Sequence, residues 1–381
     1  MTVFHTADAP AGRRAELPAG APDRHDTRDA AAAPSRRRLR VLTWHVHGNY
    51  LYYLTQVPHD FFLVTLPGHP PGHVGKVGVL PWGDNVHEVR LDELGRHDFD
   101  CVLYQHVSHW QTDRLTHLTP AQRALPTLYL EHDPPQGHPT DTVHPAAGSG
   151  AHIVHVTHFN ALMWDSGTAP THVVEHGVLI PPEARYGGER AQGIVVVNHL
   201  RERGRRLGAD VFERVRRQVP LELVGMDSLS LGGAGEVPNL DLPATMGRYR
   251  FFFNPIRYTS LGLAVVEAMT VGLPIVGLAT TELSAVIKNG VSGWIDTRIE
   301  PLVDAMRALL ADPALAARWG AGARATARER FGIERFVADW LRVFDEVVAP
   351  QASSAPEVSP TSGATPPQSA APSAVGAGAA S

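Results

Sequence analysis

Residues 251–293 constrain the fold of this 381-residue chain more than any other segment. They read FFFNPIRYTSLGLAVVEAMTVGLPIVGLATTELSAVIKNGVSG. The first apolar run indicates a buried strand, a helix is predicted from about residue 262 to residue 270, and Gly272-Leu273-Pro274 leads into a second strand. In such a βαβ unit the helix N-terminus faces the carboxyl ends of the strands, where α/β sheets bind ligands. The helix N-terminus favours an anion, and Glu267, the one carboxylate on this helix, can accept hydrogen bonds from hydroxyl groups. Together they predict an anionic ligand that also carries hydroxyl groups.

The same alternation of apolar runs and helical stretches continues along most of the chain. The runs that predict buried strands lie at residues 39–44, 61–64, 101–104, 127–130, 152–156, 172–174, 194–197, 221–224, 251–253 and 274–277. Alternation of this kind favours parallel sheets with crossover helices. The chain is longer than one hydrophobic core usually serves, and Pro181-Pro182 begins a stretch that reads as a linker. We therefore predict an α/β protein with two doubly wound, Rossmann-like domains, 39–182 and 183–348, that face each other across a cleft.

Late in the chain, apolar residues recur at helical spacing. They predict a helix over residues 301–310 and a last helix with a wide apolar stripe, which packs back on the first domain. Residues 1–38 and 349–381 are rich in Ala, Pro, Ser and Gly and are predicted to be disordered tails.

The composition excludes several classes of protein. The chain has no run of about 18 apolar residues and no apolar signal-peptide core, so we expect a cytoplasmic protein. Its single cysteine, Cys101, lies in a predicted strand and fits a reducing compartment. A formal net charge of −5 gives no case for a nucleic-acid partner.

The segment that begins at Pro255 resembles the retaining glycosyltransferases of family 4 (group 1), which have two facing Rossmann-like domains, the GT-B fold. Those enzymes carry a Pro, a Glu four residues later, Gly-Phe-Gly-Leu, and a second Glu that begins Glu-Ala-Met. Here the corresponding letters are Pro255, Thr259, Ser260-Leu261-Gly262-Leu263 and Glu267-Ala268-Met269. The spacing continues without a gap through Gly272-Leu273-Pro274 to Gly290 and Gly293. The resemblance therefore implies a transferase that uses a nucleotide diphosphate sugar.

The resemblance also implies roles for single residues of the donor site. Glu267 matches the Glu that holds the ribose hydroxyls of the donor, whereas Thr259 replaces the Glu that contacts the transferred sugar. The backbone N–H groups of Ser260, Leu261 and Gly262 would point at the diphosphate. The alternative for this segment is a simple helix start with Ser260 as its cap, which is compatible with the same geometry. Arg203 matches a basic residue that neutralises the diphosphate. His199 matches a second basic residue of the family if one residue is deleted between the two positions. Arg201 takes the place of Arg203 as the phosphate-binding residue if the loop is shifted.

In the first domain, polar residues follow the predicted strands. Gly48 lies in the loop after the first strand, where relatives place a loop beside the donor phosphates and the acceptor. His106 follows a later strand at the place where many relatives carry a histidine near the reacting sugar, and His132 follows the next strand. We rank His106 first and His132 second as active-site residues.

The predicted function is transfer of a sugar from a nucleotide diphosphate sugar to a glycan, lipid or small-molecule acceptor, with retention. No tightly bound cofactor and no metal are expected. A lipid acceptor would bring the protein to the inner face of a membrane as a peripheral protein. One alternative is a metal-dependent hydrolase whose ligands come from His45, His47 and residues 131–133. Another is a nucleotide-sugar-binding paralogue without activity, because Thr259 stands where a carboxylate is expected.

Overall fold

The computed structural model describes residues 37–77 and 80–349. Apart from residues 37, 38 and 349, both predicted tails lie outside the described residues. Within the described ranges, none of the helices combines the length and the apolar character that crossing a bilayer requires.

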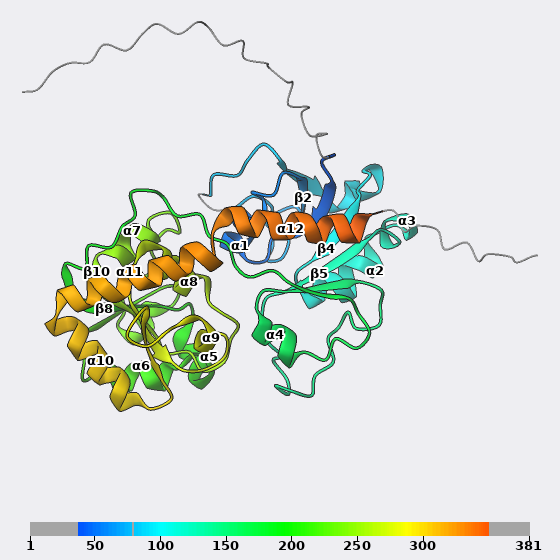
Figure 1. Cartoon of the computed structure of the whole chain (residues 1–381). Coiled ribbons are helices and arrows are strands. Elements are labelled where there is room, and N and C mark those ends of the chain that lie inside the picture. The colour runs from blue at the N-terminus through cyan, green and yellow to red at the C-terminus, as the bar shows by residue number, and fades with distance from the viewer. Residues whose placement is uncertain (1–36, 78–79, 350–381) are drawn as a thin grey trace, which may run out of the picture. The chain divides into compact units, whose positions relative to one another are not determined.

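Two parallel sheets form the framework (Figure 1). The seven-stranded sheet has the order β3-β2-β1-β4-β5-β6-β7, and the five-stranded sheet has the order β12-β11-β10-β8-β9. The strands of the first sheet are β1 (Arg40–Thr43), β2 (Asp60–Thr65), β3 (Val86–Arg90), β4 (Cys101–Tyr104), β5 (Thr127–Glu131), β6 (His152–His155) and β7 (Thr171–Val173). Those of the second are β8 (Arg190–Val196), β9 (Leu221–Val224), β10 (Tyr249–Asn254), β11 (Ile275–Leu278) and β12 (Gly293–Asp296). The predicted α/β fold with two Rossmann-like sheets is confirmed.

Helices connect these strands. Those of the N-terminal half are α1 (Gly48–Leu54), η1 (Leu91–Arg96), the π-helix η2 (His109–Asp113), α2 (Arg114–Thr116), α3 (Pro120–Arg123) and α4 (His158–Met163). Those of the C-terminal half are α5 (Leu200–Leu207), α6 (Ala209–Val215), η3 (Ser228–Leu231), α7 (Leu242–Gly247), α8 (Leu263–Val271), α9 (Leu283–Val286), α10 (Ile299–Ala311), α11 (Pro313–Arg330) and α12 (Ile333–Val348).

The order of the strands places a topological switch point in each sheet. The first sheet starts at β1 and grows outward through β2 and β3 on one side and β4 on the other. The second starts at β8 and grows through β9 on one side and β10 on the other. Ligands of open α/β sheets bind outside the carboxyl ends of the strands at such points.

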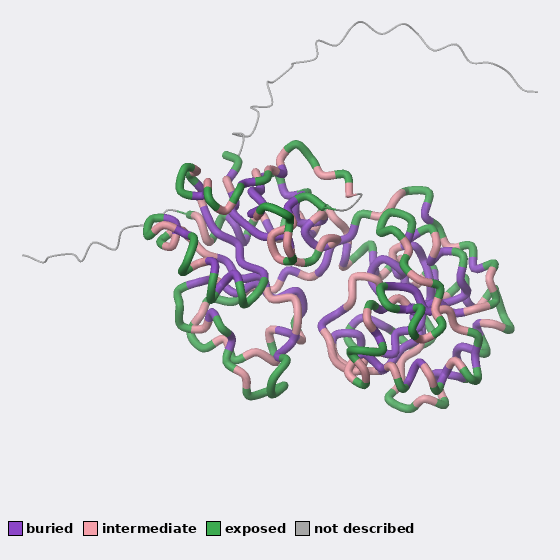
Figure 2. The backbone as a smooth tube through the Cα atoms, turned by 180° about the vertical axis from the view of Figure 1, so that it is seen from behind, coloured by how far each residue is buried: buried purple, intermediate pink, exposed green. Residues whose placement is uncertain are grey.

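Both faces of the second sheet are buried, because side chains alternate along each strand. Phe251 and Phe253 belong to a core with α6 and α10, whereas Phe252 belongs to the core that also contains residues of α8 and α11. Figure 2 shows that the buried backbone follows the interior of the molecule, whereas the loops are largely exposed. A sheet that helices cover on both faces requires apolar side chains on both faces of its strands. Apolar runs that do not alternate with polar residues meet this requirement.

The last helix, α12, packs against the first sheet and α1. Its Phe336, Trp340 and Phe344 are fully buried and share one core with residues of both sheets. The rings of Phe61 and Phe344 have centroids 6.4 Å apart. At the start of α12 the chain passes so close to Gly177 that a Cβ there would lie 2.2 Å from the Cβ of Phe336.

The unit β10-α8-β11 follows its prediction closely, with one correction. Gly272 ends α8 in the left-handed conformation with φ 107°, which glycine adopts without strain, and β11 follows directly. Ser260, however, does not cap α8. The N-cap is Gly262, which has no side chain to accept a hydrogen bond, so the first amides of the helix are left for another partner.

We expect Trp340→Ala to lower the free energy of unfolding by about 3–5 kcal/mol, because it empties a fully buried site in the shared core. Urea denaturation followed by circular dichroism measures this change. Ala338→Ser, on the exposed face of the same helix, is the control and should change stability by about 0.5 kcal/mol. Equal effects of the two substitutions would show that α12 does not contribute to the core.

Candidate active site

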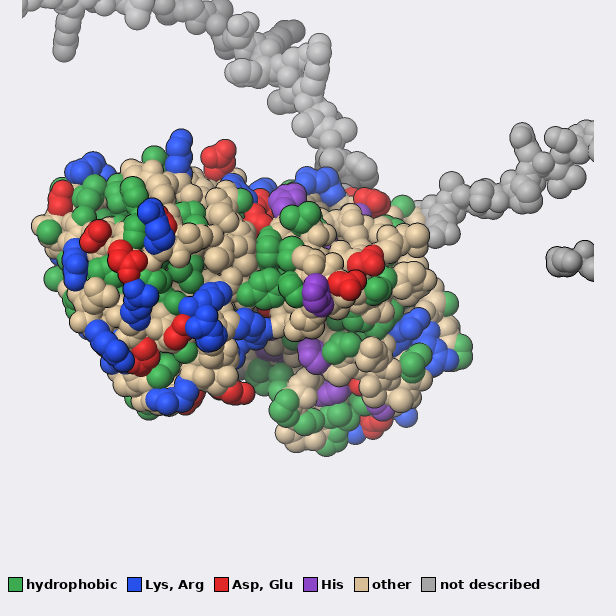
Figure 3. All heavy atoms as spheres, turned by 90° about the horizontal axis from the view of Figure 1, so that it is seen from below, with side chains coloured by type: hydrophobic (Ala, Val, Ile, Leu, Met, Phe, Trp, Pro, Cys, Tyr) green, Lys and Arg blue, Asp and Glu red, His purple; other side chains and the backbone are tan. Residues whose placement is uncertain are grey.

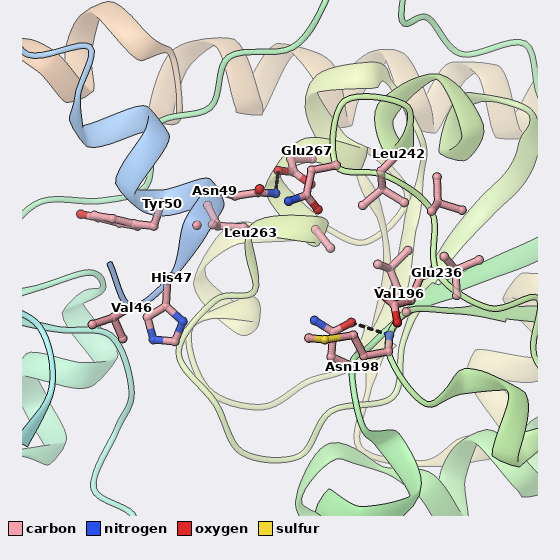
Figure 4. A pocket seen from close by; sticks show the side chains of 17 residues that line it. Val46, His47, Asn49, Tyr50, Val196, Asn198, Glu236, Leu242, Leu263 and Glu267 are labelled. Atoms are coloured by element: carbon pink, nitrogen blue, oxygen red, sulfur yellow. Dashed lines mark hydrogen bonds between the residues drawn. The ribbon is translucent and has the colours of Figure 1, made fainter. Parts of the chain in front are cut away.

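A cavity of about 490 Å³ lies beyond the carboxyl ends of β1, β8 and β9 (Figure 4). One wall is the loop after β1 and the first residues of α1, from Val46 to Tyr50. The other walls come from the ends of β8 and β9, residues 236–242, and the first turns of α8. The cavity thus joins the switch points of both sheets, which is where the fold predicts a ligand.

Glu267 lies on the wall of this cavity and is 2% exposed. The hydroxyl of Tyr53 donates a hydrogen bond to its Oε1 at 2.9 Å, and Nδ2 of Asn49 approaches the same oxygen at 3.4 Å. Both donors are on α1, so the carboxylate links the first helix of one sheet to α8 of the other. Among the described residues, the hydrogen bonds to this carboxylate go to Oε1, which leaves Oε2 for a ligand.

Burial raises the pKa of the Glu267 carboxyl, because the charged form loses its hydration. The hydrogen bonds from Tyr53 and Asn49 oppose this rise. Burial and the neighbouring carboxylate raise the pKa of Tyr53, so its hydroxyl stays protonated and remains a donor.

The first turn of α8 offers backbone donors to the cavity. The amide of Val265 bonds to the carbonyl of Gly262 at 3.0 Å, whereas the amides of Leu263 and Ala264 precede the first intrahelical bond. Both residues line the cavity. Nε2 of His176, after β7, donates to the carbonyl of Leu261 at 2.7 Å and so holds the segment that leads into the helix. Amides at a helix N-terminus favour an anion.

A second group of polar side chains surrounds His47, which lines the cavity and caps α1. The ring of His132 meets that of His47 edge-on, with centroids 4.3 Å apart. Burial lowers the pKa of His47, the charge of Asp133 opposes this shift, and His106 and Arg203 lower it further. The structure therefore brings the predicted residues His106, His132 and Arg203 together around His47.

Hydrogen bonds define the tautomer of His132. The amide nitrogen of Gln105 donates to Thr43 Oγ1 and to the carbonyl of Trp44, both at 3.0 Å, so its Oε1 is the acceptor for Nε2 of His132 at 3.2 Å. Nδ1 of His132 therefore carries the lone pair. Burial and the nearby His47 and His176 keep the pKa of His132 well below its usual value, so the ring is neutral at pH 7.

The predicted site residues fall into three sets. The first set lines the cavity and consists of Glu267 and Gly48. The second set lies around His47 and consists of Arg203, His106 and His132. The third set lies outside the cavity lining, in the segments that lead into α8 and α5, and consists of Thr259, Ser260, Leu261, Gly262 and His199. His106 is exposed and its Nδ1 lies 2.7 Å from the hydroxyl of Ser108. His199 has a left-handed backbone with φ 52° where α5 begins.

Sequence reasoning missed Tyr53, Asn49 and His176 as contacts of the α8 unit. In sequence Tyr53 and Asn49 belong to a short stretch after the first strand that gave no signal of a distant carboxylate. The sequence places His47 at a strand end that faces the predicted cleft and makes it a candidate metal ligand, but it does not rank His47 among the active-site residues. Its position directly after β1, at the switch point, was the signal that could have ranked it higher.

The ligands suggested for a metal-dependent hydrolase do not form a metal-binding group among the described residues. Nδ1 of His45 lies 2.6 Å from the carbonyl of Gly75, and Nε2 of His132 is bonded to Gln105. A carboxylate oxygen of Glu131 accepts the backbone N–H of Asp133 at 2.9 Å. These hydrogen bonds occupy atoms that a metal would need, so the geometry does not favour that alternative.

We expect Tyr53→Phe to destabilise the protein by about 1–3 kcal/mol at neutral pH, because it removes a donor from a buried carboxylate. The pKa of the Glu267 carboxyl is raised in the folded state, so the folded protein favours the protonated form. The contribution of Glu267 to stability therefore falls as the pH rises from the ordinary pKa of 4.5 through the folded-state pKa. Without Tyr53 that pKa rises further, so the loss should be larger at pH 7 than near pH 4.5. Urea denaturation at both pH values measures the difference.

Tyr52→Phe is the matched control, because the neighbouring Tyr52 is only half-buried and does not contact Glu267. The combination of Tyr53→Phe with Glu267→Gln should remove the pH dependence, since the amide does not ionise. The same loss for Tyr53→Phe at both pH values would contradict a link through the charge of Glu267.

Comparisons with known proteins agree with this geometry. The sequence profile of the family "Glycosyl transferases group 1" matches residues 233–326. The D-inositol 3-phosphate glycosyltransferase of Xylanimonas cellulosilytica is 39% identical over 92 residues, which are 24% of this chain and 22% of the relative. The chain thus matches about a fifth of the length of that curated relative.

Solved structures match over a larger part of the chain. The sucrose-phosphate synthase of Thermosynechococcus elongatus has a TM-score of 0.61 and 15% identity, covering 82% of this chain and 100% of its own. HepE of Anabaena has a TM-score of 0.60 and 13% identity, covering 81% and 100%. Residues 233–326 therefore match the group 1 glycosyltransferases, and the described part of the chain has the fold of these solved structures, the GT-B fold.

Proposed function

We propose that this protein transfers a sugar from a nucleotide diphosphate sugar to an acceptor, with retention at the anomeric carbon. The observation that carries the proposal is the buried carboxylate of Glu267 on the cavity wall. Glu267 lies one helical turn, four residues, after Leu263, whose backbone amide is the first of α8. The carboxylate of Glu267 lies near the amides of Leu263 and Ala264, which have no hydrogen-bond partner among the described residues. This pairing suits a ligand that has a vicinal diol next to an anionic group. The ribose and the diphosphate of a nucleotide have this arrangement.

Complexes of structurally similar proteins support a nucleotide donor. HepE of Anabaena was solved in complex with UDP and in complex with UDP-glucose. TarM of S. aureus was solved in a complex that contains UDP. We propose the same class of donor here, with the ribose at Oε2 of Glu267 and the base against the apolar wall formed by Val196, Val224 and Leu242.

In the proposed reaction the bond between the anomeric carbon and the diphosphate oxygen breaks, and its electron pair stays on the nucleoside diphosphate. The amides of Leu263 and Ala264 and the guanidinium of Arg203 would stabilise this developing charge. The acceptor hydroxyl attacks the same face of the sugar that the diphosphate leaves, and its proton passes to the departing phosphate oxygen. No covalent intermediate with the protein is required.

The acceptor would approach from the His47 side of the cavity. His47 and His132 have lowered pKa values, so near the reacting sugar they would act as neutral hydrogen-bonding groups and not as cations. Thr259 offers a hydroxyl where the family has a carboxylate, which would alter the contact with the transferred sugar. The acceptor is a glycan, a lipid or a small molecule, and with a lipid the protein would work at a membrane surface.

We expect a panel of nucleotide sugars to contain one that raises the melting temperature and is slowly hydrolysed to nucleoside diphosphate. Glu267→Ala should weaken nucleoside-diphosphate binding by about 1.5–3 kcal/mol, roughly 10- to 150-fold, because it removes charged hydrogen bonds to the ribose. Isothermal titration calorimetry measures this change.

Glu267→Gln is the matched control, because it keeps an acceptor for Tyr53 and should preserve the fold. Unchanged affinity in both variants would contradict the ribose role. If the protein binds a nucleotide sugar but turns over no donor with any of a panel of acceptors, it is a nucleotide-sugar-binding protein and not a transferase. Absence of any nucleotide binding would overturn the proposal as a whole.

Arg203→Ala should lower kcat by about 10²-fold or more while the melting temperature changes little, because the side chain would act on charge that develops in the transition state. Arg201→Ala is the control. Arg201 lies in the same turn of α5 and is exposed like Arg203, but its guanidinium donates a hydrogen bond to Ser230. Steady-state rates at saturating donor separate the two, and equal rates for Arg203→Ala and the wild type would remove Arg203 from the site.

A further inference from the structure

His73, His109 and Asp113 converge in the N-terminal domain, outside the cavity described above. His73 lies in the loop after β2, whereas His109 and Asp113 begin and end the π-helix η2 after β4. One ligand atom from each of the three lies within 4.8 Å of the other two. Nε2 of His73 is 2.8 Å from Oδ2 of Asp113.

The group is part of the interior of the domain. His109 is 3% exposed and Asp113 is 6% exposed. The ring of His109 stacks on Trp44, with centroids 5.1 Å apart and an angle of 12° between the planes. Among the described residues, Nδ1 of His109 has no hydrogen-bond partner although it is buried. A buried nitrogen without a partner is unfavourable, and a cation that orders the group would relieve this.

The backbone around the group is unusual on both sides. A π-helical turn is rare and is frequently found at functional sites. On the facing loop, Gly72 has φ 87°, and a Cβ at this position would lie 3.1 Å from Nε2 of His109. The loop therefore approaches the imidazole more closely than a residue with a side chain would allow.

We propose that His73, His109 and Asp113 bind a zinc ion. Two imidazoles and one carboxylate are a donor set that zinc accepts in tetrahedral geometry, with a water molecule in the fourth position. Bonds of about 2.0–2.2 Å bring the ligand atoms to about 3.3 Å from one another. The ligand atoms lie within 4.8 Å of one another, so binding would require the three side chains to draw together by an ångström or so.

A second group of similar composition, His152, His172 and Glu346, is less suited to a metal. Nδ1 of His152 and Nε2 of His172 lie 2.9 Å apart, which is a hydrogen bond between the two rings. Glu346 is 3.9 Å from His172 and its side chain is 63% exposed. On the face that Figure 3 shows, histidines gather on the N-terminal domain, so exposed histidines are a common feature of this surface and do not by themselves indicate a site.

The proposed metal would have a structural role. It would hold the loop after β2 against η2, and the carbonyl of Gly75 in that loop is 2.6 Å from Nδ1 of His45. His45 in turn lies against Gly48, where a Cβ would be 3.2 Å from its Nε2. A zinc ion would therefore stabilise the loop that supports the first residues of α1, independently of the sugar transfer proposed above.

The test is the zinc content of the full chain, purified without a polyhistidine tag and dialysed against zinc chloride and then against metal-free buffer. We expect close to one zinc ion per chain in the wild type and a lower melting temperature after chelation. Replacement by cobalt(II) should give the visible absorption of a four-coordinate ion. Asp113→Asn, which keeps the shape of the side chain, should abolish both signals, and so should His109→Ala.

His172→Ala is the matched control, and it should retain the zinc ion and the cobalt spectrum. Because the wild type alone tests binding, the result does not depend on the folding of a variant. Less than about a tenth of a zinc ion per wild-type chain would overturn the proposal. Loss of the metal in His172→Ala but not in Asp113→Asn would also overturn it, since the ion would then lie at the second group.

Discussion

The carboxylate of Glu267 is the group on which both the fold and the candidate site depend. A buried carboxylate is strongly unfavourable unless it receives hydrogen bonds. Its donors, Tyr53 and Asn49, come from α1, which is more than two hundred residues away in the chain. Any arrangement of the two sheets that separated α1 from α8 would leave this carboxylate without those donors. The requirement to satisfy one buried charge therefore restricts how the helix that carries it meets the rest of the protein.

Local patterns were sufficient to predict β10, α8 and β11. The apolar run of β10, the helix after Gly262 and the glycine that ends it are determined by residues within a few positions of one another. The family resemblance depended on the same residues, and the profile match to residues 233–326 confirms it for that segment. The alternative of Ser260 as the helix cap is wrong for a local reason too. Serine is a common N-cap, but here Gly262 takes that position and leaves the first amides free.

Contacts between distant elements could not be predicted in this way. Three features depend on elements that crossovers separate in the sequence. They are the order of strands in each sheet, the edge-on contact of His47 with His132, and the hydrogen bond from Tyr53 to Glu267. Spacing in the sequence shows which residues share one helix face or strand face, but not which strand ends become neighbours. Ranking His106 and His132 was therefore possible from their positions after strands, whereas their common neighbour His47 became evident only in three dimensions.

The residues that line the cavity include two carboxylates, Glu236 and Glu267, and no Lys or Arg, so a positive charge for an anionic ligand has to come from residues beside the lining. Burial lowers the pKa values of His47 and His132 and raises that of Glu267, so each of these shifts opposes the charged form. The uncompensated positive character then comes from Arg203 and from the first amides of α8. Loss of hydration lowers the pKa of Arg203 and the nearby Arg206 lowers it further, whereas the charges of Asp133 and Glu202 oppose this shift; a guanidinium stays charged at neutral pH in any case. Since Thr259 brings no negative charge to the segment before α8, a diphosphate would meet less repulsion there than beside the carboxylate it replaces.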